Sequence, residues 1–443
     1  MSHSASAGGP HEPGLARLSV DLTTTPTGAV ISYRSSNDDE GQISFDYGFN
    51  LSDEDKQMLQ PIALGAAVFL GQLSLARTIE LGFPTDLGAV ATLMPLAEML
   101  YDVRCWKDKL PPIPPPVITA TESARWSPIR QDVDPERAVL LWSGGKDSTL
   151  SSILLSANRF DVHPVHMSAN TGVEEQESEA VRALAQQLDV SPIAIEYEYP
   201  QYLDFSSKYA VEWNGFPLWN TVAFGRDMFL PLVALPVARV VGAGVISMGH
   251  DHECRSAYIE NYFGKRIPRN DVESTEGALV LESFIRTYCI AGTMLLPPIA
   301  QMNEWRVLSE MFINHSELMA LASFCFWPGN NCGRCAKCLR YYLAQRVLGV
   351  EVLNFDVNPL SDEGSPELGE LIREWGEGGA LFQKQVWYCL GRLVQRGDIR
   401  VAEDALREFE STVYSAIADR LDAWEEELLM LSDDPQVPDE FVV

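Results

Sequence analysis

The chain has 443 residues, of which 46% are hydrophobic and 21% are charged. This is ordinary globular composition, and the length allows two or three domains because single cores stop growing near about 250 residues. The 62 acidic side chains outnumber the 33 basic ones, and the formal charge of −29 would repel nucleic-acid backbones and anionic lipids. Direct binding to nucleic acid or to a membrane is therefore not expected.

The first part of the chain is predicted to be a tail followed by a small α+β domain. Residues 1–14 are small, polar and rich in Gly and Pro, without the apolar stretch of a secretory signal, so we expect a disordered tail on a cytoplasmic protein. Alternating polarity predicts strands at 16–24, 28–35 and 41–49, and helices follow. The uncharged stretch 57–76 contains Gln and Pro, which favours a buried helix over a membrane span.

A proline-rich segment separates this region from the next. Pro111-Pro-Ile-Pro-Pro-Pro116 can only be extended, so residues 111–136 are predicted to link an N-terminal domain, 15–110, to a second domain, 137–354. The remaining residues, 355–443, are predicted to form an acidic helical region. Between Leu406 and Leu431 its apolar residues recur every three or four positions, which fits packing on its own domain or a contact surface for a partner.

Strands and helices alternate in the second domain. Apolar runs predict strands at 138–142, 162–167, 193–197 and 245–248, and the helices between them include one long helix at 225–241. This alternation predicts an α/β fold with a parallel sheet and right-handed crossovers. Ligands of such sheets bind at the carboxyl ends of the strands.

A glycine-rich loop follows the first strand of that domain. The run Leu140-Leu-Trp-Ser-Gly-Gly-Lys-Asp-Ser-Thr149 leaves an apolar strand, turns through two glycines and enters a helix. Such a turn directs several backbone N–H groups at one point, at the positive end of a helix dipole. A Walker A loop is excluded because an aspartate follows the Gly-Lys pair. We expect phosphate groups at this loop, and the predicted contacts are Ser143, Gly144, Gly145, Lys146, Asp147 and Ser148, with Asp147 either holding Mg²⁺ or capping the turn.

Four of the eight cysteines lie within fourteen residues, at Cys325, Cys332, Cys335 and Cys338. In a reducing compartment they are not expected to form disulfides. Thiolates at these spacings surround a tetrahedral ion, and four soft ligands favour Zn²⁺ over Mg²⁺ or Ca²⁺. Because four sulfurs leave no open position, the zinc is predicted to be structural, with an iron–sulfur cluster as the alternative.

The two motifs together resemble one branch of a known superfamily. Ser-Gly-Gly-x-Asp-Ser after a strand is similar to the PP-loop of ATP pyrophosphatases, and the cysteines about 180 residues later resemble the QueC-like branch, the 7-cyano-7-deazaguanine synthases. The resemblance covers roughly residues 137–350. It implies a HUP-like nucleotide-binding fold and an ATP-dependent carbon–nitrogen ligase that adenylates 7-carboxy-7-deazaguanine, releases pyrophosphate and transfers the acyl group to an amine, giving an amide or a nitrile.

The resemblance also implies roles for individual residues. Lys146 and Asp147 are expected to be catalytic, together with Arg226, which begins a matched helix and would offset negative charge in the transition state. A surface salt bridge is the alternative for Arg226. His166 and Met167 end the second strand, where the superfamily binds adenine. A purely structural place in a buried strand is the alternative for these two residues.

Substrate contacts are predicted from two polar segments. His250 and Asp251 follow the strand that ends near Gly249, where ligands of a parallel sheet gather, and a magnesium role is included for them. Lys265 and Arg266, with Arg269 close by, form a basic run in an acidic protein and would attract ATP and a carboxylate. A solvated loop is the alternative for the first segment.

Three functions remain open from the sequence. The enlarged chain resembles QueC-like proteins of bacterial antiphage operons, of the Qat and type IV CBASS kinds, which implies antiviral defence and a partner-protein amine as the acyl acceptor. A tRNA thiolase shares the loop, but the charge of −29 opposes an RNA-binding surface. A non-catalytic scaffold of a defence complex is the third. The oligomeric state is left open.

Overall fold

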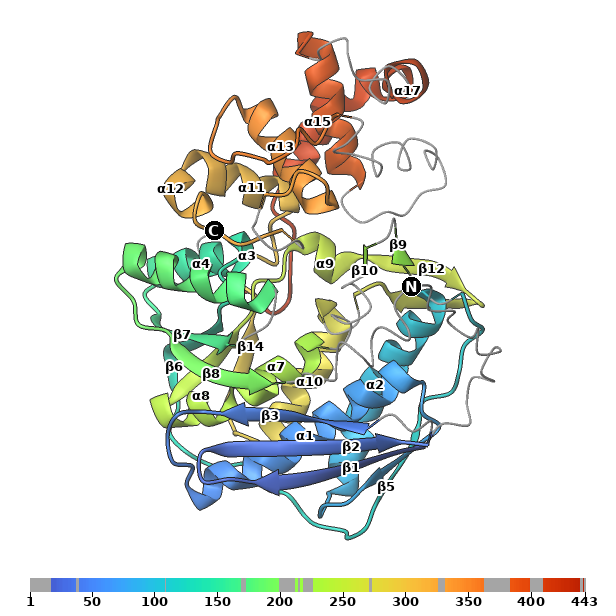
Figure 1. The fold of residues 1–443 in the computed structure, drawn as a ribbon, viewed down its shortest axis with the longest axis vertical. Coiled ribbons are helices and arrows are strands. Elements are labelled where there is room, and N and C mark those ends of the chain that lie inside the picture. The colour runs from blue at the N-terminus through green and yellow to red at the C-terminus, as the bar shows by residue number, and fades with distance from the viewer. Residues whose placement is uncertain are drawn as a thin grey trace, which may run out of the picture.

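The computed structural model describes a defined set of residues within the chain. They are residues 17–36, 40–107, 109–168, 173–198, 212–213, 216–217, 226–270, 273–325, 331–361, 383–398, 409–438 and 441. The tail expected at 1–14 lies outside these residues. Figure 1 shows the strands of a large sheet, with helices packed beside them, in the lower part of the view, and a helical lobe with α11, α12, α13, α15 and α17 in the upper part.

The centre of the molecule is a ten-stranded mixed sheet. Its strand order is β14 (Met294–Leu296), β11 (Ala243–Ser247), β6 (Asp134–Leu141), β7 (Asp161–Ser168), β8 (Ile193–Glu198), β3 (Glu40–Asp46), β2 (Gly28–Ser35), β1 (Arg17–Thr24), β4 (Thr78–Leu81) and β5 (Val117–Ala120). The first five strands are parallel, which confirms the α/β fold predicted for this part.

The N-terminal strands extend the same sheet. The three strands expected before residue 50 are present, and β3 pairs with β8 in antiparallel register, Phe45 opposite Tyr197. The segment expected as a linker supplies β5, which pairs with β4. One core of buried side chains runs from Leu18 to Leu295 across both parts. The domain boundaries given above stay a prediction.

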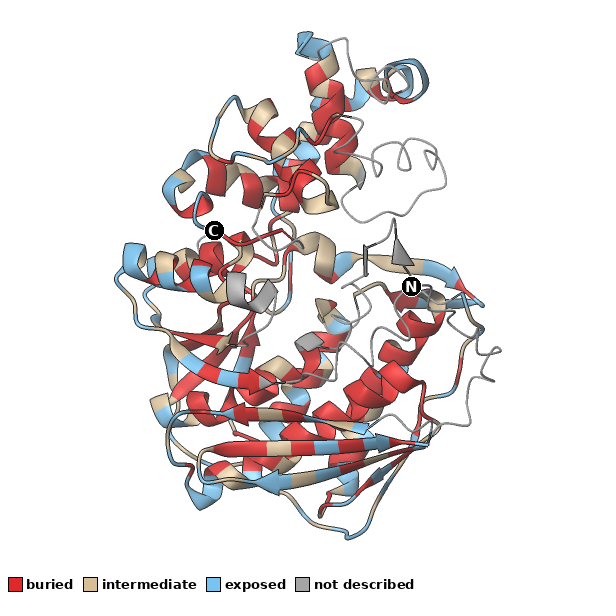
Figure 2. Ribbon diagram, viewed as in Figure 1, coloured by how far each residue is buried: buried red, intermediate tan, exposed pale blue. Residues whose placement is uncertain are grey.

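Two long helices cover the N-terminal strands. They are α1 (Asp53–Ser74) and α2 (Leu87–Lys107). Ser52 begins α1 with a reciprocal capping box, in which Asp55 bonds back to the backbone of Ser52, and nearly every residue from Met58 onward is buried. The apolar stretch at 57–76 is therefore a core helix, as expected (Figure 2). Among the described helices, none combines the length and apolar character that crossing a bilayer requires.

Helices alternate with the parallel strands. They are α3 (Lys146–Ala157), α4 (Val173–Leu188), α7 (Arg226–Val233), α8 (Leu235–Val241), the single turn α9 (His252–Ser256) and α10 (Thr275–Tyr288). The helix expected at 225–241 is present from Arg226, but it is divided at Ala234 into α7 and α8. Pro231 and Pro236 lie on either side of this break, and a proline cannot donate the backbone bond that a continuous helix needs.

Short ribbons and a helical lobe complete the fold. The ribbons pair β9 (Glu212–Trp213) with β10 (Phe216–Pro217), and β12 (Tyr258–Tyr262) with β13 (Lys265–Pro268). The lobe holds α11 (Glu304–Ile313), α12 (Ser316–Met319), α13 (Ala336–Leu348), α15 (Gln383–Arg396), η2 (Glu410–Tyr414), α17 (Ser415–Ile417), η3 (Ala418–Arg420) and α18 (Leu421–Leu429).

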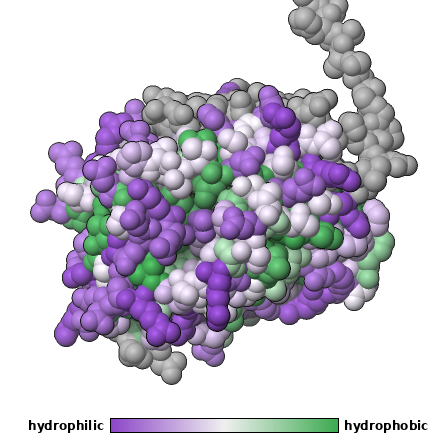
Figure 3. Space-filling view, turned by 90° about the horizontal axis from the view of Figure 1, so that it is seen from below, coloured by the Kyte–Doolittle hydropathy of each residue, from purple (hydrophilic) through white to green (hydrophobic). Residues whose placement is uncertain are grey.

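The apolar stripe near the end of the chain packs within this lobe. Val413, Ile417, Leu421 and Trp424 are buried in a second core with side chains of α11, α13 and α15. The stripe therefore covers the chain's own helices, as the first of the two expectations stated. The outer surface is largely hydrophilic on the face seen in Figure 3, where apolar areas are small and separated, in keeping with the excess of acidic residues.

Candidate nucleotide site and cysteine cluster

The glycine-rich loop lies between β6 and α3. Gly144 has φ +73°, a left-handed conformation that glycine adopts without a steric penalty, and its carbonyl accepts the Ser323 N–H at 2.8 Å. Gly145 is the N-cap residue of α3 and has no side chain that could accept a hydrogen bond from the first N–H groups of the helix. The hydroxyl of Ser148 donates to the Gly145 carbonyl at 3.3 Å. The loop thus presents the helix terminus that an anion requires.

His166 supports the loop from the neighbouring strand. Its Nδ1 bonds the Trp142 carbonyl at 3.1 Å and its Nε2 bonds the Ser178 hydroxyl at 2.8 Å. The first contact requires a proton on Nδ1, and the second lets Nε2 accept, so a neutral ring satisfies both. Burial lowers the pKa of His166, which favours the same neutral form. Met167, the next residue, packs partly buried against the main core.

Lys146 is buried between two carboxylates. Its Nζ lies 2.5 Å from Asp147 Oδ1 and 2.6 Å from Glu304 Oε2. Burial by itself would lower the pKa of Lys146, but the two carboxylates outweigh it and raise that pKa well above its ordinary value. Burial likewise would raise the pKa of Glu304, yet Lys146 and Arg340 outweigh it and lower that pKa. Both groups of the pair are therefore charged.

Three carboxylates converge beside this lysine. Asp147, Asp251 and Glu304 each place an oxygen within 4.8 Å of the others. Burial and the carboxylates of Glu253 and Glu304 raise the pKa of Asp251 well above its ordinary value. Carboxylate oxygens are hard ligands of the kind that Mg²⁺ prefers, and a divalent cation would relieve the repulsion that raises this pKa. The donor set therefore fits Mg²⁺.

One of these three acids, Glu304, was not predicted from the sequence, and neither was a role for its neighbour Glu253. Glu304 begins α11, and its backbone N–H donates to Glu253 Oε2 at 2.7 Å. Burial raises the pKa of Glu253 to about 7. Glu253 belongs to the polar run that follows β11, and this position at the end of a parallel strand could have identified it as a candidate site residue. Glu304 lies 157 residues beyond Asp147, and no local pattern marks it.

The start of α13 adds positive charge on the same side. Arg340 Nη1 lies 3.6 Å from Glu304 Oε1, and Lys337 is near enough to act on the charges of Asp147 and Glu304. Lys146 Nζ also lies 5.8 Å from the centre of the Tyr341 ring. The sequence signal for these residues was their spacing: Lys337 and Arg340 are three apart on one helix, directly among the clustered cysteines.

The four clustered cysteines face one another. Their sulfur atoms all lie within 4.8 Å, with Cys325 to Cys335 at 3.9 Å and Cys332 to Cys338 at 3.7 Å. Zinc–sulfur bonds of about 2.3 Å at tetrahedral angles separate sulfurs by about 3.8 Å. The cluster could therefore hold Zn²⁺ with little rearrangement. Cys335 is also the N-cap of α13, so the cluster and the Lys337–Arg340 turn share one element.

The basic run expected to attract substrate is engaged with carboxylates and rings. Lys265 Nζ lies 2.9 Å from Glu98 and 3.0 Å from Asp102, on α2. Arg266 pairs with Glu260 at 3.3 Å and stacks on the ring of Tyr258, within the β12–β13 ribbon. The structure thus gives these two cations partners outside the carboxylate cluster, and their substrate role stays a prediction.

The other predicted residues are placed as follows. His250 directly precedes Asp251 between β11 and α9, partly buried. Arg269 lies over the ring of Trp106, 5.6 Å from its centre. Arg226 is the first residue of α7, but its side chain lies outside the described residues. A role for Arg226 beside the phosphates therefore stays a prediction.

Comparison with known proteins gives one consistent set of relatives. No protein-family model matches the chain. It is 23% identical over 247 residues to a 7-cyano-7-deazaguanine synthase of Sulfolobus acidocaldarius, covering 51% of this chain and 48% of the relative. A synthase of the same name from Nitratiruptor is 28% identical over 131 residues, 28% of this chain and 58% of the relative. The synthase of Saccharolobus solfataricus is 22% identical over 262 residues, which cover 55% of this chain and 52% of the relative.

The chain spans about half the length of the curated relatives that it matches. All three relatives are 7-cyano-7-deazaguanine synthases, the family that the loop and cysteine motifs resemble. The chain is similar to the 7-cyano-7-deazaguanine synthases, which confirms its resemblance to the QueC-like branch of the PP-loop proteins.

Proposed function

We propose that the chain is an AMP-forming carbon–nitrogen ligase that activates a carboxylate on a 7-deazaguanine. The observation that carries the proposal is the arrangement around Lys146, in which an uncapped helix terminus, a buried lysine and three converging carboxylates meet at one end of the parallel strands. Phosphates and a divalent cation are the ligands that such a set accommodates together. The deazaguanine is proposed because the relatives are 7-cyano-7-deazaguanine synthases.

The residues divide the work by charge. Backbone N–H groups at Gly145 and Lys146 would bind the β- and γ-phosphates, and Lys337 and Arg340 would add positive charge from α13. Asp147, Asp251 and Glu304 would hold Mg²⁺, which shields the phosphate charges from the incoming carboxylate. On ATP binding, the Lys146 ammonium would exchange part of its contact with Glu304 for a phosphate oxygen, because both are anionic acceptors.

The reaction then runs in two steps, adenylation of the carboxylate and transfer of the acyl group to an amine. The substrate carboxylate attacks the α-phosphorus, the bond to the bridging oxygen breaks, and pyrophosphate leaves. An amine then attacks the acyl carbon of the adenylate, loses a proton and expels AMP, which forms an amide. Carboxylates are poor electrophiles because their leaving group would be oxide, whereas AMP is a good leaving group.

Pyrophosphate release from ATP and Mg²⁺ in the presence of 7-carboxy-7-deazaguanine tests the proposal. We expect release with this acid and none with guanine, which lacks the carboxylate. Lys146→Ala provides the control, since it should abolish release while the fold is checked by circular dichroism. Release that required tRNA and no carboxylate would favour a thiolase, and no release with any substrate would favour a scaffold.

We extend the proposal to the acyl acceptor and to defence. Mass spectrometry of the products distinguishes ammonia from an amine of a partner protein as the acceptor. Ammonia gives a free amide, or a nitrile if a second ATP adenylates the amide oxygen and AMP then leaves with that oxygen, whereas a partner gives a deazaguanine adduct on that protein. The role in antiphage defence rests on the resemblance alone. Phage plating on cells that express the native operon or its Lys146→Ala variant tests it, and equal plating on both would reject it.

A further inference from the structure

The end of the described chain folds back across the nucleotide-binding half. We call residues 430–438 the C-terminal strap. Its Ser432 N–H donates to the Gln301 carbonyl at 2.9 Å, just before α11. Val437 is buried in one apolar cluster with Leu140 of β6 and Leu296 of β14. The strap therefore connects the helical lobe to the strand that leads into the phosphate loop.

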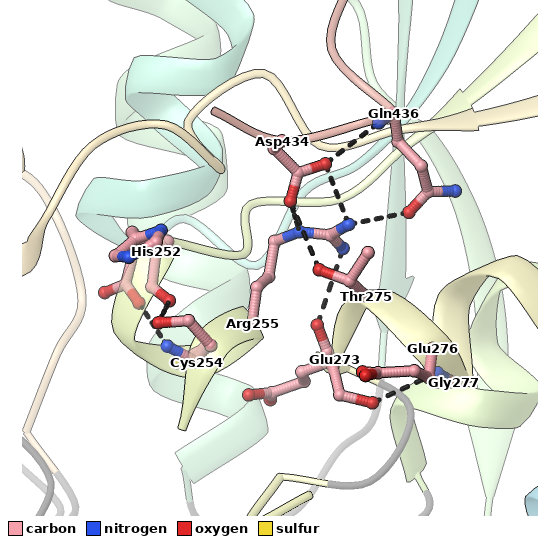
Figure 4. A network of polar contacts seen from close by, with 12 residues as sticks. His252, Cys254, Arg255, Glu273, Thr275, Glu276, Gly277, Asp434 and Gln436 are labelled. Atoms are coloured by element: carbon pink, nitrogen blue, oxygen red, sulfur yellow. Dashed lines mark hydrogen bonds and ion pairs between the residues drawn. The ribbon is translucent and has the colours of Figure 1, made fainter. Parts of the chain in front are cut away.

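Asp434 of the strap accepts two parallel hydrogen bonds from Arg255. Arg255 Nε donates to Asp434 Oδ2 at 2.6 Å and its Nη2 donates to Oδ1 at 3.0 Å (Figure 4). The two side chains are only 1% and 4% exposed. The same guanidinium donates to Gln436 Oε1 at 2.7 Å. Bidentate pairing with this burial fixes the orientation of the arginine as well as its position.

Arg255 belongs to the turn that carries acids of the candidate site. The turn, α9, has five residues, which is too short to be stable without tertiary contacts. Asp251 caps it by accepting the Cys254 N–H at 2.8 Å, and Glu253 accepts the Glu304 N–H at 2.7 Å. One end of α9 thus faces the carboxylate cluster and the other is clamped by the strap.

We propose that Asp434 is a positioning residue for the nucleotide site. Through Arg255 it holds α9 at the angle that brings Asp251 to Asp147 and Glu304. A buried ion pair is weak evidence for stability, because well-packed apolar replacements are often neutral. Orientation is the contribution that such replacements do not reproduce. The inference rests on the proposed function for its effect on catalysis, and on geometry alone for its effect on α9.

Two variants and two measurements test this role. Asp434→Asn removes the charge and keeps the shape, and the double variant Arg255→Met with Asp434→Leu removes both charges so that neither is left buried alone. Amide hydrogen exchange of a peptide spanning 249–257 reports on α9. Magnesium dependence of pyrophosphate release reports on the carboxylate cluster. We expect exchange to be at least tenfold faster in both variants, and the Mg²⁺ concentration for half-maximal rate to rise at least fivefold with a smaller change in kcat.

Arg392→Met is the matched control. Arg392 lies in the helical lobe, 2.7 Å from Asp422 and 2.5 Å from Glu425, so both of these ion-pair partners lie in the lobe and not in α9. It should lower the melting temperature without altering exchange at 249–257 or the magnesium dependence. Unchanged exchange in both strap variants would overturn the proposal, as would faster exchange with an unchanged magnesium dependence. A wild-type chain that releases no pyrophosphate would reject the proposed ligase, while the exchange measurement would still decide whether the strap orders α9.

Discussion

Lys146 and Glu304 form an ion pair that is sealed from solvent, with Nζ 2.6 Å from Oε2 and side chains 2% and 3% exposed. Lys146 comes from the phosphate loop and Glu304 from the first residue of α11. The pair therefore joins the nucleotide-binding half to the helical lobe. Because an unpaired charge is costly at this depth, neither residue can be replaced without consequences for the other.

Glu304→Gln is the first test of this arrangement. The amide keeps the shape but removes the charge that offsets Lys146 and one oxygen ligand from the carboxylate cluster. We expect a loss of about 3 kcal/mol in the free energy of unfolding, and a fall in pyrophosphate release on the order of 10²-fold. Urea unfolding and a steady-state assay across Mg²⁺ concentrations measure the two effects.

Glu310→Gln on the same helix serves as its control. Glu310 is 37% exposed and pairs with His315 at 3.6 Å, so its loss should change stability by less than about 1 kcal/mol. Activity should be unaffected. If Glu304→Gln released pyrophosphate at the wild-type rate, the carboxylate cluster would have no part in the chemistry.

Lys337→Met tests the cationic side of the site. Lys337 lies on the first turn of α13, and its positive charge is near enough to Asp147 to act against the burial that raises the pKa of that carboxyl, so its ammonium should also attract ATP phosphates. Loss of this charge is expected to raise the KM for ATP about tenfold or more. The zinc content should change little, because methionine keeps most of the apolar stem of the lysine side chain. Arg346→Met, on the same helix beside Tyr342, should leave the KM unaltered. Equal KM values for both variants would remove Lys337 from the site.

Local patterns were sufficient for the loop, the cysteine cluster and the strands. The Ser143–Ser148 run predicted a turn between a strand and a helix, the spacing of the four cysteines predicted that they converge, and the alternation of apolar runs predicted the parallel sheet. What the patterns did not contain was the pairing of Phe45 with Tyr197, which merges the N-terminal strands with that sheet. Two strand edges that are compatible in polarity carry no signal of which edge they join, because the partner lies about 150 residues away.

The same limit explains which site residues were missed. Asp251 was found because it follows a strand, and its neighbour Glu253 was within reach of the same reasoning. Glu304 looks like an ordinary first-turn acid of an amphipathic helix, since acids are common there for dipole reasons. Only the packing of α11 against α3 turns it toward Lys146. Lys265 shows the converse: a basic run in sequence is held by Glu98 and Asp102 in the fold.

His166→Gln tests the neutral imidazole beneath the loop by its effect on acid stability. Burial lowers the pKa of His166, so the folded chain does not take up the proton that the unfolded chain binds below about pH 6.5. Stability should therefore fall as pH drops from 6.5 toward the folded pKa, by up to about 1.4 kcal/mol per unit. Glutamine can donate to the Trp142 carbonyl and accept from Ser178 without titrating, so this part of the slope should vanish.

The control for this slope is His163→Gln on the same strand. His163 lies beside Asp161, with Nε2 3.3 Å from Oδ2, at a partly exposed site. Its replacement should leave the contribution of His166 in place. Urea unfolding at pH 7.5, 6.5 and 5.5 provides the comparison, and identical slopes for wild type and His166→Gln would show that His166 takes up its proton without unfolding.

Gly333→Ala tests whether the cysteine cluster needs the tight turn between its second and third ligands. Gly333 has φ +72°, and a Cβ there would lie 1.9 Å from the Val357 carbonyl oxygen. Gly349, at the end of α13, has φ +71° but no atom within 4 Å of its would-be Cβ. Gly349→Ala therefore carries only the backbone cost of about 1–2 kcal/mol, whereas Gly333→Ala must also displace residue 357.

We expect zinc content and folding yield to fall together in Gly333→Ala, because metal binding and folding share one free energy, and to be preserved in Gly349→Ala. Full zinc occupancy in both variants would show that the turn can shift without cost to the cluster.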